Sequence, residues 1–331
     1  MKLQNKKILI TGGAGFIGSN LVDYFLENDN TVVVLDNLLT GKEENISQHF
    51  ENKKFTFING DIRDLDTCKK AVKGIEFVFH QAALGSVPRS INDPITTNAI
   101  NISGFLNMLT ACKDEKVKRF IYAASSSTYG DSKALPKLED NIGKPLSPYA
   151  ITKYVNELYA NVFSNLYGLE VIGLRYFNVF GKRQDPNGAY AAAIPLFIIQ
   201  LLSGESPTIN GDGSITRDFT YIKNVVQINE LAAIVDNKVA ANQVYNVAYG
   251  ENITLNSLLD ILKNNLSKYK PDIKNIEVIY GPNRIGDIQD SLANIDKARN
   301  LLAYNPKYSV KEGLEEAIEW YWEHFNSVQD I

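Results

Sequence analysis

The chain contains only two cysteines in 331 residues, Cys68 and Cys112. Their spacing is not that of a metal site. Each cysteine falls in a segment with helical periodicity, where a small apolar side chain suits a buried position. We therefore expect two reduced structural thiols and no metal centre.

The sequence also lacks an excess of one charge and long hydrophobic runs. Its 34 Lys and Arg residues are scattered among 38 Asp and Glu residues, and the net charge is -4. This pattern argues against binding to nucleic acid or to an anionic membrane. The longest apolar run, 191–202, is interrupted by Pro195 and Gln200 and is too short for a membrane span. No signal peptide is recognisable at the N-terminus, so we expect a cytosolic protein.

What the sequence does contain is a regular alternation of β-branched apolar runs and helical patterns. The apolar runs predict strands at 7–10, 31–35, 55–59, 77–81, 119–123 and 171–175, and the helical patterns include 15–26, 100–112 and 148–166. This order is typical of βαβ units. It predicts an α/β fold with a Rossmann-type doubly wound parallel sheet.

The length and the 44% hydrophobic content allow a large core and indicate two closely associated lobes. We expect residues 1–181 to form a dinucleotide-binding domain, to which 219–248 returns as a helix and a strand. A smaller α/β lobe for the substrate would comprise 182–218 and 249–331, with a last helix that begins near Lys311.

A glycine-rich turn follows the first predicted strand and opens a helix. Gly12 permits a tight turn, Gly15 lets backbone N–H groups approach a pyrophosphate, and Gly18 lets helix and strand pack closely. Glycines also serve plain turns. Here, however, Asp36 ends the second predicted strand, where a carboxylate can accept hydrogen bonds from an adenosine ribose. Because Asn37 and not a basic residue follows, NAD is favoured over NADP, whose 2′-phosphate the carboxylate would repel.

A second pattern places Tyr149 four residues before Lys153 at the start of a predicted helix. Ser147 can cap this helix, and Pro148 suits its first position. The two side chains then share one helix face. A neighbouring ammonium, a nicotinamide cation and the helix N-terminus would all favour the tyrosine phenolate, which is a base. Taken alone, the pair would be better explained as a surface Tyr and Lys on an amphipathic helix.

Together these segments resemble the short-chain dehydrogenase/reductase superfamily, in which a YxxxK motif follows a GxxGxxG turn and a serine-rich strand end, here 123–130. The length, the turn glycines and the segment 175–178 resemble its extended branch, which acts mostly on nucleotide sugars. Within that branch the chain is most similar to bacterial UDP-N-acetylhexosamine 4-epimerases of surface-polysaccharide and lipopolysaccharide synthesis, especially in 81–90, 146–153 and 174–193. The resemblance covers nearly the whole chain.

The resemblance implies a reversible reaction at C4 of a UDP-sugar, with tightly held NAD as the cofactor. Tyr149 would take the proton of the 4-hydroxyl while C4 gives a hydride to NAD, and the resulting 4-keto sugar would turn over and be reduced from its other face. Lys153 would lower the Tyr149 pKa and bind the nicotinamide ribose, and Ser125 would hydrogen-bond the reacting oxygen.

The resemblance also implies two sets of binding residues. For NAD these are Gly12, Gly15, Phe16, Ile17, Gly18, Asp36, Asn37, Thr40, Gly41, Asp61, Ile62, Gln81, Ala82, Ala83, Asn101, Tyr149, Lys153 and Phe177. For the UDP-sugar they are Gly85, Ser86, Ser125, Ser126, Ser127, Tyr149, Asn178, Ala192, Ala193, Asn210, Arg217, Arg284, Asp287 and Ser291.

Five positions narrow the choice of reaction and of sugar. Related 4,6-dehydratases carry Asp and Glu where this chain has Ser126 and Ser127, and related decarboxylases carry a Glu there, so an epimerase fits better. Epimerases restricted to UDP-glucose and UDP-galactose tend to carry Tyr at the position of Ser291. With Ser291, and with Ala192 and Ala193 in place of a bulkier Asn-Leu pair, the cavity should accept a 2-N-acetyl group. The alternative for Ser291 is a residue that simply ends a loop.

We therefore expect interconversion of UDP-N-acetylglucosamine (UDP-GlcNAc) and UDP-N-acetylgalactosamine (UDP-GalNAc). One alternative substrate is UDP-N-acetylhexosaminuronic acid, whose C6 carboxylate would need a cation such as Arg89 or Arg183. UDP-glucose and a non-catalytic NAD-binding sensor are the others. The resemblance further implies a homodimer that packs helices such as 100–112 and 148–166 into a four-helix bundle.

Overall fold

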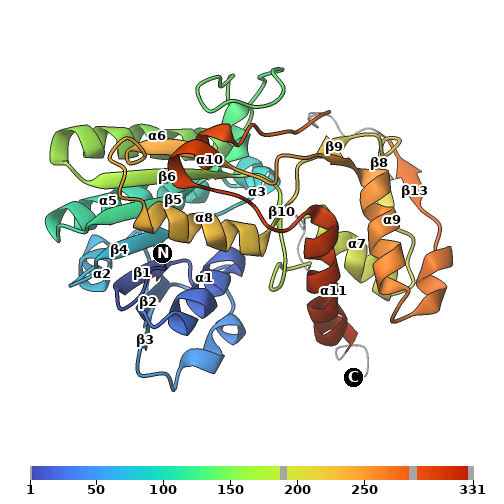
Figure 1. Ribbon diagram of the computed structural model, residues 1–331, viewed down its shortest axis with the longest axis horizontal. Helices are drawn as coiled ribbons and strands as arrows, with labels where there is room; N and C mark the ends of the chain where they lie inside the picture. The colour runs from blue at the N-terminus through green and yellow to red at the C-terminus, as the bar shows by residue number, and fades with distance from the viewer. Residues whose placement is uncertain (1, 187–191, 283–288, 327–331) are drawn as a thin grey trace.

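The computed structural model describes residues 2–186, 192–282 and 289–326. Its centre is a parallel sheet of seven strands in the order β11-β6-β5-β4-β1-β2-β3 (Figure 1). The strands are β1 (Lys7–Thr11), β2 (Thr31–Asp36), β3 (Phe55–Asn59), β4 (Phe77–His80), β5 (Arg119–Ser125), β6 (Glu170–Tyr176) and β11 (Gln243–Val247). The predicted doubly wound α/β fold is confirmed, and the seventh strand comes from the segment 219–248.

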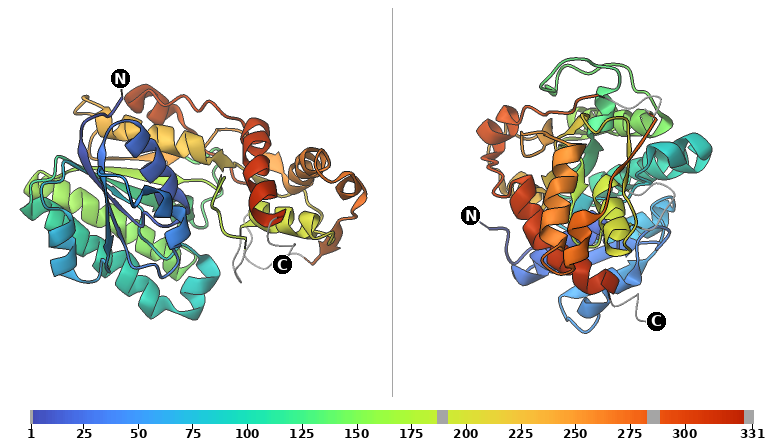
Figure 2. Two further views of the ribbon diagram at one scale, coloured as in Figure 1. Left: turned by 90° about the horizontal axis from the view of Figure 1, so that it is seen from below. Right: turned by 90° about the vertical axis from the view of Figure 1, so that its right-hand side faces the viewer.

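Helices cover both faces of the sheet, as Figure 2 shows. One face carries α1 (Phe16–Glu27) and α8 (Ile222–Ile234), and the other carries α2 (Leu65–Ala71), α5 (Phe105–Asp114) and α6 (Pro148–Tyr167). Because side chains alternate along a strand, Ile8 and Ile10 of β1 enter one core layer and Leu9 enters the other. Both cysteines are free thiols in the second layer.

The predicted helix 100–112 is not a single α-helix. The chain runs from α3 (Val87–Asn92) and α4 (Pro94–Asn98) through a π-helical stretch, Ala99–Gly104, into α5. The wider turn coincides with a tertiary contact, since the Asn101 carbonyl accepts a hydrogen bond from the Asn156 side chain at 2.7 Å. The Asn101 side chain in turn bonds the backbone N–H and C=O of Leu84 at 2.8 and 3.2 Å. The regular helix is thus interrupted where these tertiary hydrogen bonds are made.

A second lobe lies beside the end of the sheet, at the right of Figure 1. Its helices α7 (Ala193–Leu202), α9 (Leu255–Leu266) and α11 (Val310–Asn326) pack against one another. Short strands pair around them: β8 (Thr208–Asn210) with β13 (Ile279–Gly281), β9 (Thr216–Arg217) with β12 (Ile253–Thr254), and β7 (Val179–Phe180) with β10 (Thr220–Tyr221). The range 249–331 does not lie wholly in this lobe, because α10 (Asp296–Leu302) packs on β11 and α8.

Short 3-10 turns complete the fold at Glu43–Asn45, Ser47–His49, Ser126–Tyr129 and Pro271–Asn275. In the described part of the chain, none of the helices has the length and apolar character needed to cross a membrane.

Candidate active site

A cavity of about 490 Å³ opens at the carboxyl ends of β1, β2, β4 and β5. Sixteen of the eighteen residues predicted for NAD line it: Gly12, Gly15, Phe16, Ile17, Gly18, Asp36, Asn37, Thr40, Gly41, Asp61, Ile62, Gln81, Ala82, Ala83, Tyr149 and Lys153. Gly85, Ser86 and Ser125, predicted for the sugar, line it as well. A ligand in this cavity would lie at the carboxyl ends of parallel strands, where open α/β sheets bind their ligands.

The glycine turn leaves no room for larger side chains. Gly12 has φ +69°, and a Cβ on it would lie 2.7 Å from the Ala82 backbone nitrogen. A Cβ on Gly18 would lie 2.1 Å from the Gly12 carbonyl oxygen. The turn, the start of α1 and the strand end at Ala82 are therefore in direct backbone contact, and the N-terminus of α1 faces the cavity.

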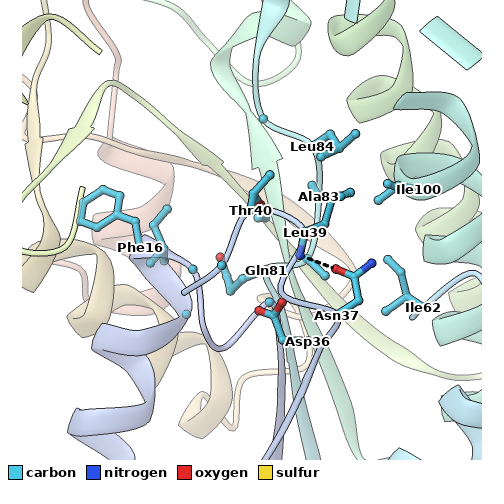
Figure 3. A pocket seen from close by; sticks show the side chains of 18 of the residues that line it. Phe16, Asp36, Asn37, Leu39, Thr40, Ile62, Gln81, Ala83, Leu84 and Ile100 are labelled. Carbon is cyan, nitrogen blue, oxygen red and sulfur yellow. Dashed lines mark hydrogen bonds between the residues drawn. The ribbon is translucent and has the colours of Figure 1, made fainter. Parts of the chain in front are cut away.

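Asp36 ends β2 with both carboxylate oxygens hydrogen-bonded to backbone N–H groups, from Ala14 and Leu38, each at 2.9 Å. Burial raises the pKa of Asp36 in spite of these two bonds. Its neighbour Asn37 donates to Asp61 at 2.8 Å. In Figure 3, Asn37, Leu39, Ile62 and Ile100 lie on the side of the cavity away from Phe16. This end combines apolar contacts with polar oxygens, as an adenosine group requires.

Tyr149 and Lys153 lie in the first turns of α6. As predicted, Ser147 caps this helix, accepting from the Ala150 N–H at 3.1 Å, and Pro148 occupies its first turn. The Lys153 ammonium donates to the Ala123 carbonyl at 2.8 Å and lies 6.0 Å from the centre of the Tyr149 ring. The two side chains are thereby brought together at the end of β5, and the ammonium is held between the helix and the sheet.

Burial governs the proton affinity of both groups. It raises the pKa of Tyr149, which a hydrogen bond with Ser125 lowers in part. Burial also lowers the pKa of Lys153 to about 8, against the opposing effect of the Glu157 carboxylate. Without a bound cation, burial thus outweighs the factors that we expected to favour the phenolate. The pair is therefore a half-buried phenol beside an ammonium, suited to exchange a proton with a bound hydroxyl.

A second cavity of about 310 Å³ lies where the sheet meets the second lobe. It brings together five residues predicted for the UDP-sugar: Asn178, Ala192, Ala193, Asn210 and Arg217. The Arg217 guanidinium donates to the backbone carbonyls of Thr216 and Gln289 at 2.8 and 3.4 Å. The two cavities flank the end of β6, because Tyr176 lines the first and Asn178 lines the second.

Several predicted residues line neither cavity. Asn101 is turned towards Leu84, and Phe177 is 1% exposed and packs on Tyr129. Ser126 and Ser127 belong to the turn after β5, where the Ser127 hydroxyl donates to Ser125 at 2.9 Å. The Ser291 N–H donates to the Thr216 carbonyl at 3.2 Å, next to Arg217. Arg284 and Asp287 lie outside the described residues.

Other lining residues escaped the sequence analysis. Leu39, Lys42, Asn45, Leu84, Ile100, Tyr176 and Asp185 line the first cavity together with Arg89 and Arg183. The sequence pointed indirectly to two of them, because Leu39 and Lys42 fall in the predicted cofactor loop around Thr40 and Gly41. Asn45 and Asp185 gave none, because only the folding of distant loops brings them to the cavity.

His80 ends β4 directly before the cavity and is buried. Its Nδ1 lies 2.9 Å from the Thr11 hydroxyl, which also accepts from the Ala82 N–H at 3.3 Å. Burial, and then the positive charge of Lys153, lower the pKa of His80 to about 3 from 6.5. The unfolded chain therefore binds a proton at this residue between pH 6.5 and pH 3 that the folded chain does not bind.

The stability that depends on a neutral His80 should be complete above pH 6.5 and decline as the pH falls towards 3. This group alone should cost the wild type about 3–5 kcal/mol of unfolding free energy across that range. We expect the His80→Asn variant to lose this part of the pH dependence in urea unfolding. Equal slopes of the unfolding free energy against pH for the wild type and His80→Asn would contradict the assignment.

Comparison with known proteins places the chain among sugar-nucleotide enzymes. A model of the NAD dependent epimerase/dehydratase family matches residues 8–248. The protein named putative UDP-glucose 4-epimerase of Methanocaldococcus jannaschii is 39% identical over 315 residues, which cover 95% of this chain and 97% of that protein.

Two solved structures are similar along their whole length. UDP-N-acetylglucosamine 4-epimerase from Methanobrevibacter ruminantium, in complex with UDP-N-acetylmuramic acid, is 41% identical, with a TM-score of 0.91 and coverage of 98% of this chain and 100% of that one. UDP-glucuronic acid 4-epimerase from Bacillus cereus, in complex with UDP-glucuronic acid and NAD, is 32% identical, with a TM-score of 0.86 and coverage of 96% and 100%.

Proposed function

The chain belongs to the NAD-dependent epimerase/dehydratase family, and we propose that it is a UDP-N-acetylglucosamine 4-epimerase. It would interconvert UDP-GlcNAc and UDP-GalNAc. The broader assignment, a UDP-sugar 4-epimerase, is supported by relatives named as 4-epimerases of UDP-glucose, UDP-N-acetylglucosamine and UDP-glucuronic acid.

NAD is the cofactor of this family, and the first cavity fits it. The backbone contacts of Gly12 and Gly18 leave the N-terminus of α1 open to a pyrophosphate. The Asp36 carboxylate would accept from ribose hydroxyls, and Ile62 and Ile100, which line the same cavity, would make apolar contacts with an adenine. When bound, NAD supplies a reversible acceptor for the hydride of the sugar C4.

The residues of the chain would supply the proton chemistry. Tyr149 would take the proton of the 4-hydroxyl and return it after the sugar has turned over. Ser125, which hydrogen-bonds Tyr149, would hold the reacting oxygen. The Lys153 ammonium, fixed on the Ala123 carbonyl, would stabilise the phenolate form of Tyr149. Each turnover would leave the cofactor in its starting state.

The UDP group would bind in the second cavity. Arg217 is a cation on its wall, and a guanidinium can donate two parallel hydrogen bonds to phosphate oxygens. Asn178 lies on the same wall and donates to the Asp218 carbonyl at 3.0 Å. We propose that Arg284 and Asp287 complete this set of UDP-binding residues.

The choice of sugar is carried by one observation, the small side chains near Arg217. Ala192 and Ala193 line the second cavity, and Ser291 is hydrogen-bonded to the strand residue that precedes Arg217. Small residues leave room for a 2-N-acetyl group. Initial rates with equal concentrations of UDP-GlcNAc and UDP-glucose test the choice, and faster turnover of UDP-glucose would refute it.

A uronic-acid substrate is the second candidate. Arg89 and Arg183 both line the cofactor cavity, and a relative acts on UDP-glucuronic acid. Arg183, however, pairs with Asp23 at 2.9 Å, which leaves Arg89 as the better partner for a C6 carboxylate. If the enzyme turned over UDP-N-acetylglucosaminuronic acid faster than UDP-GlcNAc, and Arg89→Met removed that preference, this candidate would replace the first.

Ser291→Tyr should change the sugar preference. A ring placed beside Thr216 would occupy the space assigned to the N-acetyl group, while a 2-hydroxyl needs less room. We expect kcat/KM for UDP-GlcNAc to fall about 10- to 100-fold relative to that for UDP-glucose. Ser291→Ala should keep the ratio of the wild type. An unchanged ratio in Ser291→Tyr would show that residue 291 does not gate the pocket.

We further propose that the enzyme is a homodimer formed through α6. Ile151, Leu158, Val162 and Leu166 lie on one face of this helix, and 45–69% of each is exposed. Such a stripe is unusual on a free surface. The helices α3 and α4 pack against α6 and expose Ile91 and Ile95.

Leu158→Glu should therefore convert the dimer into a monomer in size-exclusion chromatography with light scattering. A charge buried in an apolar interface costs several kcal/mol, which is enough to dissociate a dimer at micromolar concentration. Val239→Glu is the control, because Val239 is 64% exposed on a loop far along the chain from α6. A wild-type monomer, or a Leu158→Glu dimer, would refute the proposed interface.

A further inference from the structure

A buried ion pair lies one helical turn beyond Lys153. Glu157 of α6 accepts two hydrogen bonds from Arg175 of β6, at 2.8 and 2.7 Å, and the two side chains are 7% and 4% exposed. A buried pair of this kind often adds no stability over an apolar pair of the same volume. Stabilisation of the core therefore does not explain why Glu157 and Arg175 form a buried ion pair at this place.

Arg175 is itself fixed on every side. Its guanidinium donates to the Glu139 carbonyl at 2.8 Å and lies 4.9 Å from the centre of the Tyr129 ring. The Tyr129 hydroxyl donates to Asn246 at 2.6 Å. Three parts of the fold thus hold the arginine, and the arginine holds the Glu157 carboxylate in one orientation.

The same carboxylate lies one helical turn from Lys153. Glu157 follows Lys153 by four residues on one face of α6, and Arg175 pairs in register with Ala124, next to the Ala123 carbonyl that receives the Lys153 ammonium. The Glu157 carboxylate opposes the loss of the Lys153 proton that burial causes. An ammonium that is only 3% exposed needs such a partner, because burial removes most of the solvation of its charge.

We propose that Glu157, oriented by Arg175, is a positioning residue that keeps the Lys153 ammonium charged and in place beside Tyr149. This inference rests on the proposed roles of Tyr149 and Lys153. It adds that the reaction also requires the carboxylate of Glu157, one helical turn after Lys153. It predicts that the charge on Glu157, and not its packing, is what the reaction needs.

Other charged and titratable groups face the same region. They are Tyr149 on α6, His80 on β4, Tyr122 on β5, Tyr129 on the turn after β5, Arg175 and Tyr176 on β6, and Arg89 on α3. Among the described residues that face Lys153, Glu157 is the one carboxylate that raises its pKa. Neutralising Glu157 should therefore leave the Lys153 ammonium with no nearby negative charge to offset the effect of burial.

Glu157→Gln tests the proposal, with Glu170→Gln as a matched control. Glu170 of β6 accepts two hydrogen bonds from Arg119 of β5, at 2.9 and 2.7 Å, at the opposite end of the strand that carries Arg175, and its side chain is 39% exposed. In Glu157→Gln, the pKa of Lys153, measured by NMR of lysines labelled at Cε and assigned with Lys153→Met, should fall by at least about one unit, a tenfold change. The alkaline limb of the kcat profile should move to lower pH by the same amount.

Glu170→Gln should change neither the Lys153 titration nor the kcat profile. If Glu157→Gln fails to fold, the double variant Glu157→Gln/Arg175→Met replaces the whole pair and should show the same shift. A folded variant in which Lys153 titrates as in the wild type would overturn the proposal, even if it were less stable. If Tyr149→Phe or Lys153→Met remained active, the proposed catalytic roles would fail instead, so the two failures are distinguishable.

Discussion

Tyr149→Phe should lower kcat for UDP-sugar epimerisation by about 10²–10⁴-fold, the range that a positioned general acid-base group contributes. The variant keeps the ring and loses only the hydroxyl. That hydroxyl hydrogen-bonds Ser125, and the half-buried ring lies 6.0 Å from the Lys153 ammonium. KM and the amount of NAD bound should stay within about twofold, because an effect confined to the proton transfer appears in kcat.

Tyr176→Phe is the control for this experiment. Tyr176 lines the same cavity and is also half-buried, but its hydroxyl donates to Gln81 at 3.2 Å and accepts from Asn229 at 3.0 Å and does not bond Ser125. Loss of this hydroxyl should change kcat by less than about threefold, since it removes a hydrogen bond away from the reacting oxygen. If Tyr149→Phe kept more than a tenth of the wild-type kcat, or if Tyr176→Phe were the slower enzyme, the assignment of Tyr149 would be wrong.

The parts of the fold and of the site that depend on local rules could be predicted from the sequence. The strand 7–10, the glycine turn and Asp36 follow one another within one βαβ unit, so the chain order alone places them at one sheet edge. Ser147, Pro148, Tyr149 and Lys153 likewise belong to one helix start, and the structure places them as predicted. In both segments, the contacts that position these residues are made within a few residues along the chain or between adjacent parallel strands.

Residues whose positions depend on distant contacts could not be placed from the sequence. Asn101 and Phe177 resemble family positions, yet the Asn101 amide bonds Leu84 and Thr152, and the Phe177 ring packs on Tyr129. The π-helical stretch around Asn101 has no sequence signature, and it coincides with a contact to Asn156, fifty-five residues away. Asp185 and Arg183 reach the cofactor cavity through ion pairs with Lys42 and Asp23, which no periodicity could reveal.

Gly18→Ala should remove most of the bound NAD. The added Cβ would lie 2.1 Å from the Gly12 carbonyl oxygen and 2.8 Å from the Gly12 carbonyl carbon, and these atoms are backbone that cannot rotate away. The start of α1 would have to retreat from β1, and the N–H groups that face the pyrophosphate would move with it. Overpacking of this kind costs about 1–3 kcal/mol, which corresponds to a loss of affinity of about 5- to 150-fold.

The measurement is the NAD content of the purified protein, together with NAD affinity by calorimetry after removal of the cofactor. Gly281→Ala on β13 is the control, because a Cβ there would meet its nearest atoms at 3.7 Å, an ordinary contact, and Gly281 lies outside the cofactor cavity. A lower melting temperature in Gly18→Ala with unchanged affinity would mean that the close approach serves only the packing of α1. Loss of affinity in the folded variant would instead support the assignment of the turn to the pyrophosphate, since α1 would keep its partners in the core while its first turn moved.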